Sequence, residues 1–295
     1  MTAFRSGTVA VVGRPNVGKS TLVNALAGRK VTIVSDKPQT TRHGIRAILT
    51  TRHSQMVLTD TPGFHKPRTS LGARLNGQVS DAIAGVDVVV HVVDAAAGVG
   101  RGDAFVYRRQ VGPARASARL CVVNKIDRLR HHEIVPQLAA AAALGDFDEI
   151  VPVSARDGEG VEQVRTLVLE RIPEGAPLYP EDIESDQPLE LRLAEIVREK
   201  ALEVAREEVP HSIAVLVDEL EPGDGLARVH ATIVVERDSQ KGIVIGRGGE
   251  TLRAIGEPAR EEMELLLGSR VYLDLRVKVL KNWQRDPKAL NRLGL

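Results

Sequence analysis

The first 171 residues alternate short apolar runs with longer stretches in which apolar residues recur every three or four positions. Short runs of this kind are typical of strands buried on both faces, and the longer spacing is typical of amphipathic helices. The pattern predicts strands at residues 9–12, 45–49, 56–59, 86–94, 119–123 and 149–153, and helices at 21–28, 71–83, 103–110, 133–144 and 161–171. Strands that alternate with helices predict an α/β domain, with a mainly parallel sheet covered by helices on both faces.

The remainder of the chain follows a different pattern. Residues 172–188 hold four prolines and five acidic residues without any period, which indicates a linker. Beyond it we predict a helix at 189–207, strands at 213–220 and 227–236, a glycine-rich segment at 242–249, a helix at 250–267 and a strand at 271–279. The order α-β-β-α-α-β predicts a smaller α+β domain. We therefore divide the chain into residues 1–171, a linker at 172–188, and a second domain with a C-terminal tail at 189–295.

The composition indicates a globular protein without a membrane-spanning stretch, a signal peptide or an internal disulfide. The chain has 295 residues, 43% of them hydrophobic and 27% charged, which is ordinary for a globular protein. No apolar stretch reaches 18 residues, and the run at 9–12 is too short for the core of a signal peptide, so we expect a cytoplasmic location. The lone cysteine, Cys121, lies in an apolar run and excludes a disulfide within the chain.

Charge is distributed unevenly along the chain. Residues 1–171 hold 23 Lys and Arg against 15 Asp and Glu, a net charge of +8, whereas residues 172–295 hold 17 against 24, a net charge of −7. Within that second part, residues 240–295 hold 11 against 7, a net charge of +4. A nucleic-acid site in the second domain therefore has to be local.

The segment GRPNVGKS at residues 13–20 has the G-x-x-x-x-G-K-S pattern of a phosphate-binding P-loop and lies between a predicted strand and a predicted helix. Its glycines let successive backbone N–H groups turn inward toward phosphate oxygens, and the following helix adds its positive N-terminal end. Lys19 is predicted to place its charge on the β- and γ-phosphates. The hydroxyl of Ser20 is predicted to bind Mg²⁺.

Two further segments are predicted to sense the γ-phosphate. Asp60 opens the sequence Asp-Thr-Pro-Gly at the end of a strand, where an acid can hold Mg²⁺ through water, and the backbone N–H of Gly63 can reach the γ-phosphate. Either Thr40 or Thr41 can close over Mg²⁺, and we favour Thr41. The predicted metal ligands are thus Ser20, Thr41 and Asp60. Such loops become ordered around the γ-phosphate and are released after hydrolysis, which makes a switch.

The sequence Asn-Lys-Ile-Asp at residues 124–127 matches a pattern that reads guanine. The Asp127 carboxylate can accept hydrogen bonds from N1–H and the 2-amino group of guanine, whereas adenine would leave it unpaired. The Lys125 stem can cover the base, and the N–H of Ala155 can donate to guanine O6. The predicted GTP and GDP site comprises Gly13, Arg14, Pro15, Asn16, Val17, Gly18, Lys19, Ser20, Thr21, Asp60, Thr61, Pro62, Gly63, Phe64, Asn124, Lys125, Ile126, Asp127, Ser154, Ala155 and Arg156.

The glycine-rich segment of the second domain contains a G-x-x-G loop, Gly246-Arg247-Gly248-Gly249, between two predicted helices. In a domain of order α-β-β-α-α-β this loop resembles that of the KH module, which clamps about four single-stranded nucleotides. Arg247 and Lys241 would add charge at the phosphates. Ile243 and Ile245 would line a groove for bases, although either one can instead belong to the hydrophobic core.

The motifs GRPNVGKS, PQTTR, DTPG, NKID and SAR, in this order, resemble those of translation-factor-class P-loop GTPases. With the second domain and the linker PLYPEDIESDQP, nearly the whole chain resembles the Era family, bacterial GTPases with a C-terminal KH domain of type II. The resemblance implies a monomeric GTPase that needs Mg²⁺. It also implies a switch that binds the 3′ end of 16S rRNA and assists 30S ribosomal subunit biogenesis.

Two positions bear on the hydrolysis step. Phe64 stands where Ras-type GTPases have a water-orienting glutamine, so intrinsic hydrolysis should be slow. Asn16 matches a P-loop asparagine that in related GTPases helps to hold K⁺, although an asparagine is also common in turns. The predicted catalytic set is Lys19, Asn16, Thr41 and Gly63.

Alternatives remain at this point. The chain could be a membrane-associated or cell-cycle signalling GTPase that uses the KH surface for a protein, or an RNA-binding module whose nucleotide site is only structural. Era-type proteins are reported to approach the inner face of the cell membrane peripherally. Trp283, in a basic C-terminal segment, is either packed or available to RNA or a membrane surface. A single P-loop argues against the related double-GTPase family.

Overall fold

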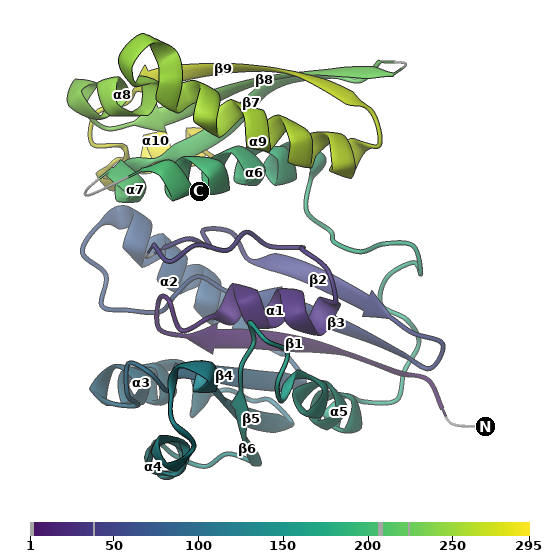
Figure 1. Ribbon diagram of the computed structural model, residues 1–295. Coiled ribbons are helices and arrows are strands. Elements are labelled where there is room, and N and C mark those ends of the chain that lie inside the picture. The colour runs from purple at the N-terminus through teal and green to yellow at the C-terminus, as the bar shows by residue number, and fades with distance from the viewer. Residues whose placement is uncertain (1–2, 38, 206–208, 224) are drawn as a thin grey trace. The chain divides into compact units, whose positions relative to one another are not determined.

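A computed structural model describes residues 3–37, 39–205, 209–223 and 225–295. Contacts divide the chain into two units: Met1–Val34 with Thr41–Arg68 and Gly72–Asp186, and Ser35–Thr40 with Thr69–Leu71 and Gln187–Leu295. The P-loop and the predicted guanine-reading segments lie in the first unit, and the G-x-x-G loop lies in the second (Figure 1).

The first unit is built on a six-stranded sheet of order β2-β3-β1-β4-β5-β6 (Figure 1). Every strand pair is parallel except β2 with β3. The strands are β1 (Arg5–Gly13), β2 (Ile45–Thr50), β3 (Ser54–Asp60), β4 (Val88–Asp94), β5 (Ala118–Asn124) and β6 (Glu149–Val153). The helices are α1 (Lys19–Ala27), α2 (Ser70–Ile83), α3 (Arg101–Val106), α4 (His131–Ala142) and α5 (Val161–Arg171), with a short 3₁₀ turn at Ile126–Arg128.

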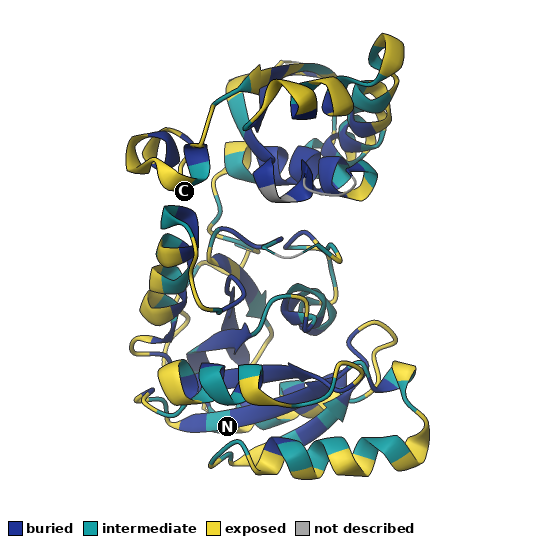
Figure 2. Ribbon diagram, turned by 90° about the vertical axis from the view of Figure 1, so that its left-hand side faces the viewer, coloured by how far each residue is buried: buried dark blue, intermediate teal, exposed yellow. Residues whose placement is uncertain are grey.

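Helices cover both faces of this sheet, and all seven residues of β4 are buried (Figure 2). Side chains of α1 and α5, such as Leu22 and Val164, share a core with Val9 and Val90. On the opposite face, α2 and α3 pack over β1 and β4, and α4 packs over β5. The predicted α/β fold is confirmed. One predicted helix differs, because residues 103–110 divide between α3 and a π-helical turn at Tyr107–Val111.

The second unit is a three-stranded sheet of order β7-β8-β9, antiparallel between β7 and β8 and parallel between β8 and β9. Its strands are β7 (Ala214–Glu221), β8 (Leu226–Val235) and β9 (Arg270–Val279). Its helices are α6 (Leu189–Val204), α7 (Val209–Ser212), α8 (Asp238–Ile245), α9 (Glu250–Leu267) and α10 (Pro287–Arg292), with 3₁₀ turns at Arg247–Gly249 and Trp283–Arg285. Helices α6, α8 and α9 bury one face of the sheet.

The order of these elements confirms the predicted α+β class of the second domain. The first helix is shorter than predicted: Ala205 leaves the helical region with ψ of 137°, and residues 206–208 lie outside the described part of the chain. Trp283 is fully buried, and its indole N–H donates to the carbonyl of Ser212 at 3.1 Å. The tryptophan is therefore a packed residue, and its ring is not available to RNA or a membrane surface, whereas contact of the basic segment 281–285 with either stays a prediction.

The predicted linker packs against the first unit along much of its length. The Gln55 side chain accepts from the N–H groups of Leu178 and Tyr179 at 2.7 and 2.8 Å and donates to the Tyr179 carbonyl at 2.9 Å. Further along, the Ile48 N–H donates to the Glu184 carbonyl, which places the linker beside the edge strand β2.

Among the described residues, no helix combines the length and apolar character that crossing a bilayer requires.

Candidate nucleotide and RNA sites

The P-loop curls between β1 and α1 through glycines that tolerate no side chain. Gly18 has φ of +94°, and a Cβ at this position would lie 2.2 Å from the Asn124 side-chain nitrogen. Asn124 in turn donates to the Val17 carbonyl at 2.9 Å and accepts from the Ala155 N–H at 3.0 Å. Asn124 therefore joins the P-loop to the segment after β6, through one hydrogen bond to each.

Lys19 begins α1 and is only 6% exposed. Its ammonium group donates to the backbone carbonyl of Arg14 at 2.8 Å, so the lysine lies curled beneath its own loop. Burial lowers the pKa of Lys19 to about 8, against the opposing influence of the Asp60 carboxylate. Removal from water destabilises the charged form of an amine, and an anionic ligand would restore it.

Two of the predicted metal ligands, Ser20 and Thr41, donate to the third, the Asp60 carboxylate. Asp60 Oδ2 accepts from Ser20 Oγ at 2.7 Å and from Thr41 Oγ1 at 3.1 Å, and the two hydroxyls lie 3.0 Å apart. Thr32, which motif analysis missed, also donates to Asp60 Oδ2, at 2.9 Å. The neighbouring Thr40 turns elsewhere and donates to the Lys37 carbonyl at 2.6 Å.

Asp60 has the properties of a cation ligand. It is fully buried, and burial raises the pKa of its carboxyl despite the Lys19 charge and three hydroxyl donors. Its second oxygen, Oδ1, has no hydrogen-bond partner within the described part of the chain. A buried carboxylate oxygen without a partner, beside two hydroxyls, suits Mg²⁺, which prefers oxygen ligands. The residues present therefore fit a magnesium ion held by Ser20, Thr41 and Asp60.

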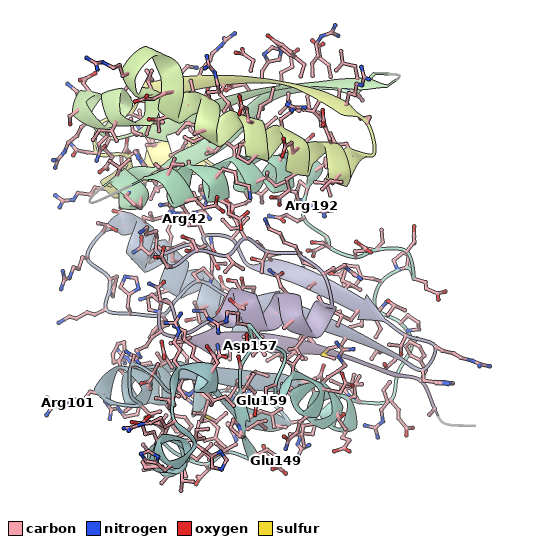
Figure 3. All side chains as sticks on the ribbon, in the orientation of Figure 1. Arg42, Arg101, Glu149, Asp157, Glu159 and Arg192 are labelled. Carbon is pink, nitrogen blue, oxygen red and sulfur yellow. The ribbon has the colours of Figure 1, made fainter. Side chains whose placement is uncertain are left out.

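The predicted guanine-reading residues lie together at the carboxyl ends of β5 and β6. Asp127 accepts from Ser154 Oγ at 2.9 Å and forms an ion pair of 3.1 Å with Arg156. Ser154 Oγ also donates to Asp157 at 3.0 Å (Figure 3). The serine and arginine thus orient the Asp127 carboxylate, and the exposed arginine can move aside for a base.

Lys125 has a left-handed backbone, with φ of +66°. Its ammonium donates to the Asn16 carbonyl and to Asp94 Oδ2, both at 2.6 Å. Its stem therefore crosses from the guanine-reading turn to the P-loop. Asp94, which ends β4, was missed by motif analysis, although an acid at the carboxyl end of a buried strand is a readable signal.

The segment after Asp60 turns its aromatic side chain into the core. Thr61 donates to the Val11 carbonyl at 2.7 Å, and Phe64 is 6% exposed with its ring centroid 5.6 Å from that of Phe105. A Cβ on Gly63 would lie 2.6 Å from the Cα of Pro15, so this glycine lies directly against the P-loop. Phe64 itself cannot orient a water molecule.

The G-x-x-G loop joins α8 to α9, and Gly246, Gly248 and Gly249 all have positive φ. Arg247 is exposed, Lys241 and Ile245 are half-buried, and Ile243 is 51% exposed on α8. Val244, between the two isoleucines, is the residue that enters the core. The predicted RNA-contacting residues thus lie on α8 and on the loop that follows it.

Beside this loop is a groove of about 320 Å³ between α9 and β9. Its walls include Gly249, Leu252, Arg253, Arg260, Leu273 and Leu275. Aliphatic walls flanked by arginines can pack against bases while meeting phosphates. Sequence reasoning missed all of these residues except Gly249, because only the tertiary structure brings β9 beside α9.

Fold and site together define a P-loop GTPase followed by a KH domain. A family model described as 50S ribosome-binding GTPase matches residues 8–125, and one described as KH domain matches residues 208–284. The GTPase Era of Mycolicibacterium smegmatis is 50% identical over 298 residues, and that of Mycolicibacterium paratuberculosis is 51% identical over 298 residues, in each case over 100% of both chains. The chain belongs to the Era family and is a GTPase.

Two solved structures are similar over 99% of this chain and 99% of their own, each at 39% identity. One is Era in complex with MgGDPNP and nucleotides 1506–1542 of 16S ribosomal RNA, with a TM-score of 0.94. The other is a tyrosine-to-alanine variant of Aquifex aeolicus Era bound to GDP·AlF4⁻, with a TM-score of 0.95.

Proposed function

We propose that this chain is a GTP-controlled RNA-binding switch that binds the 3′ end of 16S rRNA and assists assembly of the 30S subunit in the cytoplasm. Residues 1–171 would bind and hydrolyse GTP, and residues 189–295 would bind RNA. The observation that supports the proposal is that one chain carries both candidate sites: hydroxyls and a carboxylate around Asp60, and a G-x-x-G loop beside an aliphatic groove. An Era structure of 39% identity is described with both a GTP analogue and 16S rRNA nucleotides.

In the proposed reaction, the P-loop N–H groups and Lys19 stabilise charge that develops on the transferred phosphoryl group. A magnesium ion held by Ser20, Thr41 and Asp60 would neutralise charge on the β- and γ-phosphates. The Gly63 N–H would contact the γ-phosphate, and the Lys19 charge would be restored by the phosphates that it meets. Asn16 would contribute to a K⁺ site, a proposal tested by comparing hydrolysis in KCl and NaCl.

The switch would act through Thr41. Its hydroxyl lies 3.0 Å from Ser20 Oγ and 3.1 Å from Asp60 Oδ2. A Mg²⁺ ion and γ-phosphate bound there would hold it, so the loop that carries Thr41 would have different free energies in the GTP and GDP states. A ligand shifts an equilibrium only as far as it binds the two states differently. The RNA affinity of the KH domain would then differ between the two nucleotide states.

The RNA site is tested by fluorescence anisotropy with a labelled oligonucleotide carrying the 3′ tail of 16S rRNA. Gly248→Asp suits the test because a Cβ there meets nothing within 4 Å, so the change brings a negative charge to the loop without a clash. We expect its affinity to fall at least tenfold. Gly268→Asp, at the far end of α9, is the control, since it also has positive φ and open space. Equal affinity of both variants and the wild type would contradict the proposed RNA site.

A further inference from the structure

A buried acid outside the nucleotide-binding motifs, Asp103, bonds to the P-loop. The Nε of Arg14 donates to Asp103 Oδ1 at 2.7 Å. Asp103 is completely buried, and the Arg14 side chain is 31% exposed. Since Arg14 is the second residue of the loop and Asp103 lies in the first turn of α3, this pair joins the phosphate-binding loop to a helix 89 residues away in sequence.

Asp103 is itself held rigidly. Its other oxygen, Oδ2, accepts from the Gly100 N–H at 2.9 Å, which closes the N-terminal turn of α3. The Arg14 stem lies tightly over the same turn, because a Cβ on Gly102 would come within 2.5 Å of Arg14 Cδ. Both oxygens of the Asp103 carboxylate therefore accept hydrogen bonds, and the Arg14 stem packs against the first turn of α3.

The backbone of Arg14 contacts the residue that matters for the reaction. The Arg14 carbonyl accepts from Lys19 Nζ at 2.8 Å. A second acid, Asp94 at the end of β4, supports the loop three residues before Lys19, because Asp94 pairs with Lys125, whose ammonium donates to the Asn16 carbonyl. Two carboxylates thus support the residues on both sides of Pro15, Asp103 through the Arg14 side chain and Asp94 through Lys125.

We propose that Asp103 is a positioning residue for GTP hydrolysis, acting through Arg14 to fix the carbonyl that orients Lys19. Asp103 is completely buried with its oxygens on Arg14 and Gly100, so it would act only through these contacts. The inference rests on the proposed role of Lys19 at the phosphates. Charge stabilisation in a transition state depends on placement more steeply than ground-state binding does, and a displacement of about 1 Å can cost on the order of a hundredfold in rate. Loosening Arg14 should therefore slow the chemical step while leaving nucleotide affinity largely intact.

The test is single-turnover GTP hydrolysis, together with the Kd for GTP, in four proteins: wild type, Arg14→Met, Asp103→Asn and the double variant. Methionine keeps the apolar stem of Arg14 and removes the guanidinium, and asparagine keeps an acceptor for Gly100. We expect Arg14→Met to lower the rate constant of hydrolysis about tenfold with Kd changed less than about threefold. We expect the double variant to be no slower than Arg14→Met, because both changes interrupt one connection.

Arg101→Met is the matched control, since Arg101 lies in the same first turn of α3 but points away from the fold (Figure 3). It should hydrolyse GTP at the wild-type rate. A wild-type rate for Arg14→Met, or rate losses of Arg14→Met and Asp103→Asn that multiply in the double variant, would overturn the proposal. A fall in affinity equal to the fall in rate would also overturn it, since that would indicate a general loss of the loop's structure.

Lys19→Ala separates this inference from the function on which it rests. If Lys19→Ala abolishes hydrolysis while Arg14→Met hydrolyses normally, only the role of Asp103 fails. If Lys19→Ala hydrolyses GTP at the wild-type rate, the proposed catalytic role of Lys19 fails and the positioning role fails with it.

Discussion

Thr41 Oγ1 lies 3.1 Å from Asp60 Oδ2, whereas the hydroxyl of the adjacent Thr40 donates to the carbonyl of Lys37. The two threonines therefore make a matched pair for testing the proposed magnesium site. We expect Thr41→Ala to lower kcat for GTP at least tenfold and to raise the Mg²⁺ concentration for half-maximal hydrolysis, because one oxygen ligand is lost. Titrations of GTPase rate with MgCl₂ measure both quantities. Thr40→Ala should behave like the wild type, and the reverse pattern would assign the ligand to Thr40.

The pKa of Lys19, which burial lowers to about 8, predicts a pH dependence of nucleotide affinity. Phosphates bind the protonated amine and raise its pKa, so below pH 8 binding involves little proton uptake. Above pH 8 the free protein must take up a proton to bind, and Kd for GDP should rise by up to tenfold per pH unit. Titrations with a fluorescent GDP between pH 6.5 and 9.5 measure this rise. A Kd that stays constant from pH 7 to 9.5 would contradict it.

Asp127 and Asp157 both accept from Ser154 Oγ, but only Asp127 is proposed to read guanine. Asp127→Asn should weaken GDP binding by roughly a hundredfold or more, because an NH₂ donor replaces one of the two oxygens that would accept from N1–H and the 2-amino group. The same variant should gain affinity for xanthosine diphosphate, whose 2-carbonyl can accept from the new amide N–H. Calorimetric titration with both nucleotides gives the comparison. Asp157→Asn is the control, and we expect its Kd for GDP to stay within about threefold of the wild type.

Gln55 predicts a stability effect far from the nucleotide. Its fully buried side chain meets three backbone groups of residues 178 and 179, and it also donates to Thr50 Oγ1 at 2.9 Å. Gln55→Leu would remove these hydrogen bonds to partly buried groups, which should lower the free energy of unfolding of the first domain by about 1–2 kcal/mol. Urea unfolding followed by circular dichroism measures the change. Gln163→Leu on the exposed face of α5 should change it by less than about 0.5 kcal/mol.

The strands of the first domain could be predicted because a parallel sheet covered on both faces needs continuous apolar runs. Residues 149–153 and 161–171, for example, form β6 and α5 with the predicted bounds. The second domain was equally readable where a glycine ends an element, as Gly268 with φ of +64° ends α9. Local signals were weaker at Tyr107–Val111, where a π-helical turn replaces the end of a predicted helix.

The site residues show the same contrast between strong and weak local sequence signals. Ser20 and Asp60 could be named from motifs, because phosphate and metal chemistry fixes residue types at fixed spacings. The choice of Thr41 over Thr40 could not be settled from sequence, since both threonines lie in a polar loop and only the tertiary structure turns one hydroxyl toward Asp60. Thr32 and Asp103 carry no local signal, because their partners lie 28 and 89 residues away.

The linker shows a similar limit. Its prolines and acids predicted an irregular connection, yet Ser6 and Gln55 bind its backbone closely. Those bonds depend on one serine and one glutamine in separate strands, and no period or motif distinguishes these two from any other polar residue of a strand.

The central claim is that the nucleotide bound near Thr41 sets the affinity of the KH domain for RNA. The most direct test is the Kd for the 3′ tail of 16S rRNA, measured by anisotropy with saturating GDP and with a non-hydrolysable GTP analogue, in excess Mg²⁺. We expect tighter binding with the analogue by about tenfold, and we expect Thr41→Ala to remove that difference while Thr40→Ala retains it. Equal RNA affinity in the two nucleotide states of the wild-type protein would contradict the account.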